Sequence, residues 1–175
     1  MGFTDYLARH NSVAKVVFAA ILRGHKTEFH RSWWKGRPPG IVHLGQDKRN
    51  YVRWEPRFPT VDRLEHHKPD LFVILPNGKQ LIIEVTVCRD DKACTRAEEK
   101  AQKYIPLAED LARQTGKHPI VIPIAIGATG AVSKMTEDAI KKLNGMGIPL
   151  QLSKLQRAAA IGTAKIMQKY INSGP

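Results

Sequence analysis

The stretch from Lys68 to Tyr104, KPDLFVILPNGKQLIIEVTVCRDDKACTRAEEKAQKY, decides the fold of this chain. Two apolar runs, 71–75 and 80–88, flank a Pro-Asn-Gly-Lys turn at 76–79. An Asn-Gly pair between two apolar runs is the strongest short-range signal for a β-hairpin. The sequence therefore predicts a hairpin over 71–88.

Two acidic residues belong to this hairpin. Asp70 stands at the start of the first strand, and Glu84 stands inside the second strand among apolar residues. A carboxylate inside an apolar strand is costly unless a positive group compensates its charge. The pairing of the strands is expected to bring Asp70 near Glu84. Because alternate strand residues share a face, the face opposite Glu84 is expected to enter the core through Ile83, Val85 and Val87.

The two carboxylates, with the backbone carbonyl of Val85, would form a site of hard oxygen ligands suited to Mg²⁺ or Mn²⁺. A metal ion bound by Asp70 and Glu84 would stabilise charge on a scissile phosphate and lower the pKa of an attacking water. This chemistry predicts a metal-dependent nuclease.

The helix expected after the hairpin supplies positive charge. Lys100, Lys103 and Tyr104 occupy neighbouring positions of one helix face. Lys100 would position water or stabilise the transition state, and Tyr104 would hydrogen-bond to Lys100 or to a phosphate. The alternative is that both lysines belong to a solvated face, paired with Glu98 and Glu99.

Size and charge agree with a nucleic-acid enzyme. The 175 residues suit a single domain over 1–175. Lys and Arg number 28 against 16 acidic residues, a net charge of +12. This excess favours nucleic acid as partner unless the charge serves solubility alone. No membrane partner is expected, because no basic amphipathic segment is flanked by bulky apolar residues. No transmembrane run or signal peptide is expected. Two cysteines suit a reducing compartment, and the spacing of His66, His67, Cys88 and Cys94 does not support a zinc site.

The remaining pattern predicts an α/β or α+β domain, with a mixed central sheet flanked by helices. The helices are expected from Thr4 or Asp5 to Arg23, over 95–114 with a kink or split at Pro106, over 136–144 and over 153–172. Further strands are expected at 28–34, 41–44, 50–54 and 119–127.

Pro69-Asp70, a spacer of 13 residues and then Glu84 after a hairpin resemble the PD-(D/E)XK nuclease superfamily. Most members of that superfamily carry a lysine two residues after the second acid, where this chain has Thr86. The chain is more similar to one branch, the restriction-like endonuclease domain of site-specific non-LTR retrotransposons. In that branch the lysine moves to the next helix as K-x-x-K-Y.

Three motifs carry this similarity, which spans roughly residues 6–104. They are Lys100-Ala-Gln-Lys103-Tyr104, Lys68-Pro69-Asp70 and Arg9-His10-Asn11-x-Val13. The sequence departs from the branch by Glu84, where close relatives often have Asp. It also contains neither a reverse transcriptase nor the cysteine–histidine knuckle that usually precedes the domain.

The resemblance implies a restriction-endonuclease-like fold and a nuclear enzyme that nicks target DNA to prime reverse transcription, as part or partner of a reverse transcriptase polypeptide. Its site residues would be Asp70, Glu84, Lys100, Lys103 and Tyr104, with His10 as an accessory catalytic residue and with Arg9 and Lys68 contacting DNA. Arg89 and Lys92 would also contact phosphates, because they follow directly after the strand that contains Glu84. A junction-resolving or structure-selective nuclease of the same fold, a homodimer, and a non-catalytic DNA-binding module remain open alternatives.

An aromatic and basic segment precedes the hairpin. Its tryptophans would stack on bases while its cations contact phosphates, or the tryptophans would pack in the core with the cations as a solvated rim. The residues concerned are Trp33, Trp34 and Trp54, with Arg31, Lys35, Arg37 and Arg53.

Overall fold

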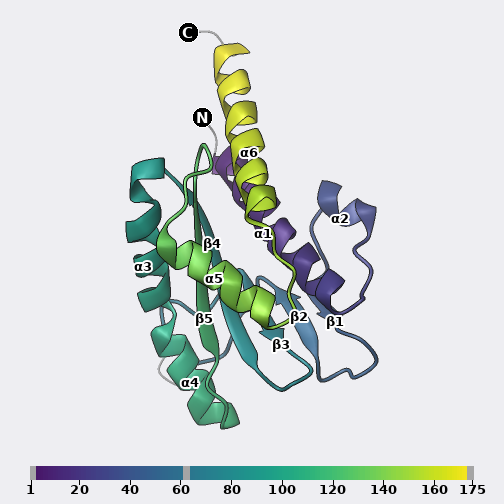
Figure 1. Ribbon diagram of the computed structural model, residues 1–175. Coiled ribbons are helices and arrows are strands. Elements are labelled where there is room, and N and C mark those ends of the chain that lie inside the picture. Colours follow the sequence, from purple (N-terminus) through teal and green to yellow (C-terminus); the bar gives the residue numbers. More distant parts are fainter. Residues whose placement is uncertain (1–2, 61–63, 173–175) are drawn as a thin grey trace.

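A five-stranded mixed sheet forms the centre of the protein (Figure 1). The structure, a computed structural model, describes residues 3–60 and 64–172. The strands follow one another in the sheet in chain order; the first four pair antiparallel, and the fifth lies parallel to the fourth. They are β1 (Ile41–His43), β2 (Tyr51–Trp54), β3 (Leu71–Ile74), β4 (Gln80–Cys88) and β5 (Ile120–Gly127). The α+β class with a mixed sheet and the predicted hairpin are confirmed.

Helices cover both faces of the sheet. They are α1 (Phe3–Gly24), α2 (Arg31–Lys35), α3 (Ala93–Lys103), α4 (Ile105–Thr115), α5 (Lys134–Gly145) and α6 (Leu152–Asn172), with a 3₁₀ turn, η1 (Asp90–Lys92), before α3. The predicted split near Pro106 is confirmed, because α3 ends and α4 begins around Tyr104. Proline supplies no backbone N–H, and it is tolerated in the first turn of a new helix.

The prediction of a strand at 28–34 is wrong. This segment contains the short helix α2, and its aromatic side chains pack on α1 instead of extending the sheet. Phe29 and Trp33 both contact Phe18 edge-to-face, with ring centroids 6.0 and 6.2 Å away. Burial of these rings against a helix decides the conformation of the segment, and β1 is left as the edge of the sheet.

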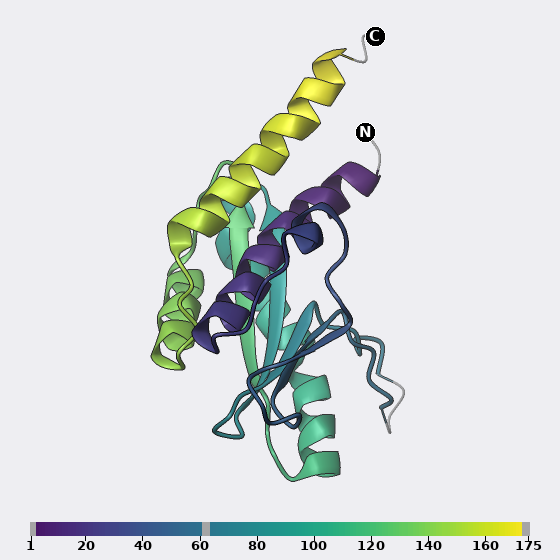
Figure 2. The same cartoon turned by 90° about the vertical axis from the view of Figure 1, so that its right-hand side faces the viewer.

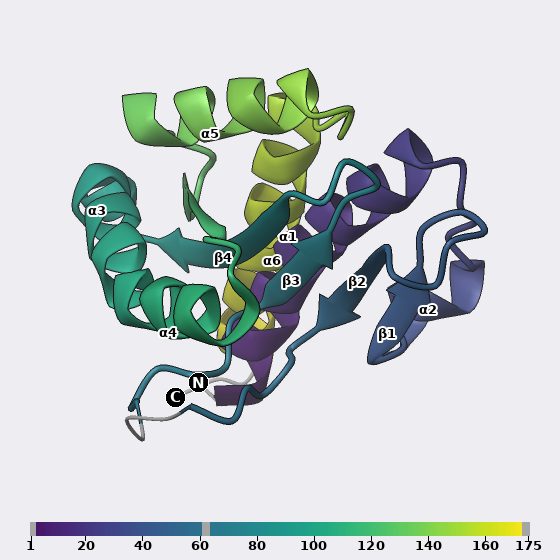
Figure 3. The same cartoon turned by 90° about the horizontal axis from the view of Figure 1, so that it is seen from below.

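Strand β4 is buried on both faces. On one face, Ile83 and Val85 join the main core formed with α1, α5 and α6, as predicted, and half-buried Val87 packs against it. On the other face, Ile82 joins a second cluster with Phe72 beneath the helix α4. Figure 3 shows α4 on one side of the sheet and α1 and α5 on the other. Glu84 shares the face of Ile82, so its carboxylate lies between the sheet and the helices.

The first and last helices lie side by side, and the start of α1 lies at the same end of the molecule as the end of α6 (Figure 2). Among the helices that the structure describes, none is long and apolar enough to cross a bilayer.

The end of α1 is packed too tightly for a side chain. A Cβ atom added to Gly24 would lie 2.0 Å from the carbonyl oxygen of Gly147 and 3.0 Å from Cδ of Pro149. We expect Gly24→Ala to lower the free energy of unfolding by about 1–3 kcal/mol, because backbone must move to relieve the overlap. Gly40→Ala is the matched control, since nothing lies within 4 Å of its added Cβ. Urea unfolding of the two variants checks this, and equal stabilities would contradict it.

Candidate active site

The carboxylate of Glu84 is the buried centre of the site. The residue is 3 % exposed. Its Oε1 atom lies 2.5 Å from Nζ of Lys100 and 3.7 Å from Nζ of Lys103. Its Oε2 atom accepts a hydrogen bond of 3.1 Å from the backbone N–H of Asp70. The positive compensation that the apolar strand required therefore comes from α3, and neither lysine belongs to a solvated face paired with Glu98 and Glu99.

The pKa of Glu84 is raised above its ordinary value. Burial is the largest cause and the negative charge of Asp70 adds to it, while Lys100 and Lys103 act in the opposite direction. Both causes penalise the ionised carboxylate. Additional positive charge beside Asp70 and Glu84 would therefore stabilise the site in its ionised form.

Asp70 is oriented from three sides. Its Oδ2 atom accepts a hydrogen bond of 2.7 Å from the N–H of Val85, and its Oδ1 atom lies 3.1 Å from Nε2 of His10. Its backbone carbonyl accepts from the N–H of Glu55 at 2.7 Å. These contacts hold the start of β3 against β4 and leave the carboxylate beside Glu84, as the hairpin predicted.

The first helix reaches the site through His10. Burial lowers the pKa of its imidazole, but the hydrogen bond to Asp70 and the negative charges of Asp70 and Glu84 outweigh burial, so the pKa of His10 is raised. A positive imidazolium is thereby favoured next to the carboxylate of Asp70. His10, which the sequence motif predicted as an accessory residue, therefore contacts Asp70 directly.

Tyr104 is buried next to the segment that leads into Asp70. Its side chain is buried, and its hydroxyl donates a hydrogen bond of 2.9 Å to the backbone carbonyl of Lys68. Burial, followed by the charges of Glu84 and Asp70, raises the pKa of its phenol, so the hydroxyl keeps its proton. The structure thus places Tyr104 where it fixes the backbone that leads into Asp70.

The residues predicted to contact DNA separate into two groups. Lys68, Arg89 and Lys92 are exposed; Nζ of Lys68 lies 3.4 Å from Glu55, and Arg89 pairs with Asp91. Arg9 is buried between α1 and α6, where its guanidinium donates to the hydroxyl of Thr163 at 3.0 Å. Three of the four cations predicted to contact DNA are therefore exposed, whereas Arg9 is not.

The oxygen atoms of Asp70, Glu84 and Val85 are donors of the kind that bind Mg²⁺. Two carboxylates lie side by side, and the N–H and C=O of a strand residue point to the same edge, so the carbonyl of Val85 faces the side of Asp70. Mg²⁺ takes one or two carboxylates and completes its shell with water and phosphate. Among residues 3–60 and 64–172, this site included, no group of three or more His, Cys, Asp or Glu side chains is arranged to hold a metal. The thiols of Cys88 and Cys94 contact Ile126 and Glu98 instead.

Glu55 was missed by the analysis of sequence motifs, although it contacts Asp70. This residue holds Asp70 through its backbone, and its side chain pairs with Arg37 at 2.8 Å and with Lys68. Its φ angle of 45° is left-handed, a conformation that non-glycine residues rarely adopt. No local motif marks such a residue, because its role depends on contacts across β2 and β3.

The chain matches none of the protein-family models and none of the curated proteins with which it was compared.

Proposed function

We propose that this protein is a Mg²⁺- or Mn²⁺-dependent DNA endonuclease with a restriction-endonuclease-like fold, related to the nicking domain of site-specific non-LTR retrotransposons. The observation that carries the proposal is the buried cluster in which Lys100 and Lys103 of α3 meet Glu84 of the hairpin, with Asp70 beside it. Those are the residues of the K-x-x-K-Y, Pro-Asp and buried-acid motifs. Its partner would be DNA in the nucleus, together with a reverse transcriptase polypeptide.

In this proposal the carboxylates of Asp70 and Glu84 and the carbonyl of Val85 hold the metal. When bound, the metal supplies charge stabilisation at the scissile phosphate and lowers the pKa of a water. The ammonium of Lys100 donates a hydrogen bond to a phosphate oxygen, where negative charge grows in the transition state. Nε2 of His10 holds its proton toward Asp70 and keeps that carboxylate in place.

The two other positive groups have supporting roles. Lys103 lies further from Glu84 than Lys100 and also sits over the ring of Tyr104, 4.9 Å from its centroid. It shares in neutralising Glu84 and would attract the DNA backbone. Lys68, exposed beside the first acid, is placed to contact a flanking phosphate.

Cleavage of supercoiled plasmid tests the proposal. We expect the wild-type protein to nick plasmid with Mg²⁺ or Mn²⁺, and we expect EDTA or the substitution Asp70→Ala to stop nicking, because the metal loses a ligand. Circular dichroism and binding to labelled duplex in EDTA serve as controls for folding and affinity.

Three outcomes would redirect the proposal. Nicking that persists in Asp70→Ala would contradict the assignment of the site. A folded wild-type protein that binds DNA in a salt-dependent way and never nicks would be a binding module. A dimer that prefers branched DNA over plasmid would be a junction-resolving nuclease of the same fold.

A further inference from the structure

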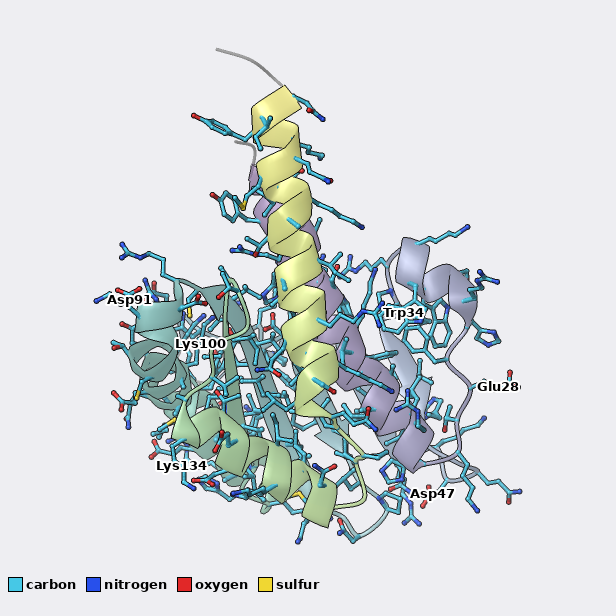
Figure 4. The ribbon with its side chains drawn as sticks, turned by 45° about the horizontal axis from the view of Figure 1, so that its top comes forward. Glu28, Trp34, Asp47, Asp91, Lys100 and Lys134 are labelled. Atoms are coloured by element: carbon cyan, nitrogen blue, oxygen red, sulfur yellow. The ribbon has the colours of Figure 1, made fainter. Side chains whose placement is uncertain are left out.

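A groove on the outer surface of the helices lies apart from the catalytic cluster. It has a volume of about 400 Å³ and lies between α1, α2 and the first turns of α6. Its floor is apolar, and the residues that form it are Val16, Ala19, Ala20, Leu150, Ala158 and Ile161. In Figure 4, Trp34 and Lys100 lie on opposite sides of α6, so this groove is a separate feature of the surface.

Trp34 forms one wall of the groove, and contacts with Lys15 and Phe29 fix its position. Of the three tryptophans, Trp54 and Trp33 pack in the core, whereas Trp34 is 46 % exposed. The buried ammonium of Lys15 donates to the backbone carbonyls of Trp34 and Gly36 at 3.1 and 2.5 Å, and the indole lies 4.9 Å from the ring of Phe29. A large aromatic ring is thus presented to solvent on a fixed backbone.

Three cations surround this apolar floor. Arg23 ends α1, and Lys154 and Arg157 stand on α6, all with exposed side chains. None of the three forms an ion pair within the described part of the chain, and no acidic residue is among the described residues that line the groove. An anionic ligand with an apolar or aromatic portion complements such a surface.

The positive surface continues toward the catalytic cluster. Trp34 also lines a second groove, of about 450 Å³, that contains Lys35 and Arg37 and reaches Asn11 and Glu55. Asn11 follows His10 in the chain, and Glu55 donates its N–H to Asp70. A polyanion that extends from the catalytic cluster would therefore meet cations along its path to the first groove. This continuity favours a nucleic-acid strand over a short acidic peptide.

We propose that the groove formed by Trp34, Arg23, Lys154 and Arg157 binds a single-stranded segment of the nucleic-acid substrate. Trp34 stacks on an unpaired base, and the three cations contact its flanking phosphates. Bases inside a duplex are stacked on both faces and are not available to an indole, so the segment is unpaired. This inference rests on the proposed nuclease function, since it assumes that the substrate is nucleic acid.

Fluorescence anisotropy in EDTA, with fluorescein-labelled oligothymidine of about 12 nucleotides and a blunt duplex of equal length, tests the groove. We expect Trp34→Ala to weaken oligothymidine binding by about 5–100-fold and to change duplex binding much less, because one stacked base is lost. Trp34→Phe keeps an aromatic face and should lose far less. Thermal unfolding shows whether both variants remain folded, and hydrogen exchange over the Trp34 segment shows whether α2 is still formed.

The cations are tested by the double variant Lys154→Gln/Arg157→Gln, whose exposed helical positions tolerate glutamine. We expect the slope of log affinity against log salt for oligothymidine to become shallower by about 1.4, because each lost phosphate contact removes about 0.7. Lys48→Gln/Lys142→Gln removes the same charge at two exposed lysines outside the groove and should leave the slope unchanged.

Two results would overturn the proposal. One is that all groove variants bind oligothymidine as the control variant does. The other is that a labelled helical peptide of glutamate and leucine binds the wild-type protein and loses affinity in the groove variants, while oligothymidine binding is unchanged. Plasmid nicking, measured in parallel, separates the two proposals. If the wild type does not nick plasmid but the groove variants bind oligothymidine weakly, the nuclease proposal is rejected and the proposal of single-strand binding in the groove is supported.

Discussion

Replacing Lys100 by methionine should lower the rate of DNA nicking by about 10²–10³-fold, because a positioned donor is removed from the place where charge develops. Methionine keeps the length and the helix propensity of the side chain. Glu84 would retain Lys103 at 3.7 Å and the N–H of Asp70 at 3.1 Å, so its charge remains partly compensated. We therefore expect the variant to fold and to bind duplex DNA with nearly unchanged affinity.

Lys103→Met is the matched control, with the same change of charge on the same helix. Nζ of Lys103 lies 3.7 Å from the carboxylate of Glu84, further than Nζ of Lys100 at 2.5 Å. We therefore expect Lys103→Met to lower the rate of nicking much less than Lys100→Met does. Single-turnover nicking with saturating protein measures the chemical step without the contribution of binding. If Lys100→Met nicks at the wild-type rate, the ion pair between Lys100 and Glu84 serves the fold and not the reaction.

The parts of this site that the sequence predicts are those set by local spacing. The hairpin turn fixes the register that brings Asp70 to the N–H of Val85 in β4, and the 3.6-residue period of α3 places Lys100 and Lys103 on one face, toward Glu84. The burial of Glu84 follows from its apolar neighbours on β4. Each of these inferences needs only residues close together in the chain.

The parts that the sequence does not predict depend on contacts between distant segments. The sequence motif predicts that Arg9 contacts DNA, yet Arg9 lies against Thr163 and Gly162, because α6 folds back along α1. The pattern predicts that Tyr104 faces Lys100 or a phosphate, yet its hydroxyl donates to the carbonyl of Lys68. The helix α2 replaces a strand because its aromatic rings are buried on Phe18. The hydrophobic periodicity of the sequence does not predict such contacts between segments that are far apart in the chain.

Phe18→Ala should destabilise the protein by about 3–5 kcal/mol, which is the usual cost of removing a buried phenyl ring. Phe18 is fully buried, and its ring contacts those of Phe29, Trp33 and Trp54 with centroids 5.7–6.2 Å away. Since 1 kcal/mol shifts the melting temperature of a chain of this size by about 2–4 °C, the midpoint should fall by about 6–20 °C. Phe18→Leu, which fills most of the volume, is the control and should cost far less.

The loss should also be uneven across the molecule, because the rings around Phe18 attach α2 to α1 and β2. In molecules that remain folded, the segment that carries Trp34 should exchange its amide hydrogens faster, whereas the Asp70–Glu84–Lys100 cluster rests on β3, β4 and α3 and should keep its protection. Hydrogen exchange read by mass spectrometry at a temperature below the new midpoint measures both segments in one experiment. Equal loss of protection in the two would mean that α2 is an integral part of the core, and that the groove at Trp34 cannot change independently of the catalytic cluster.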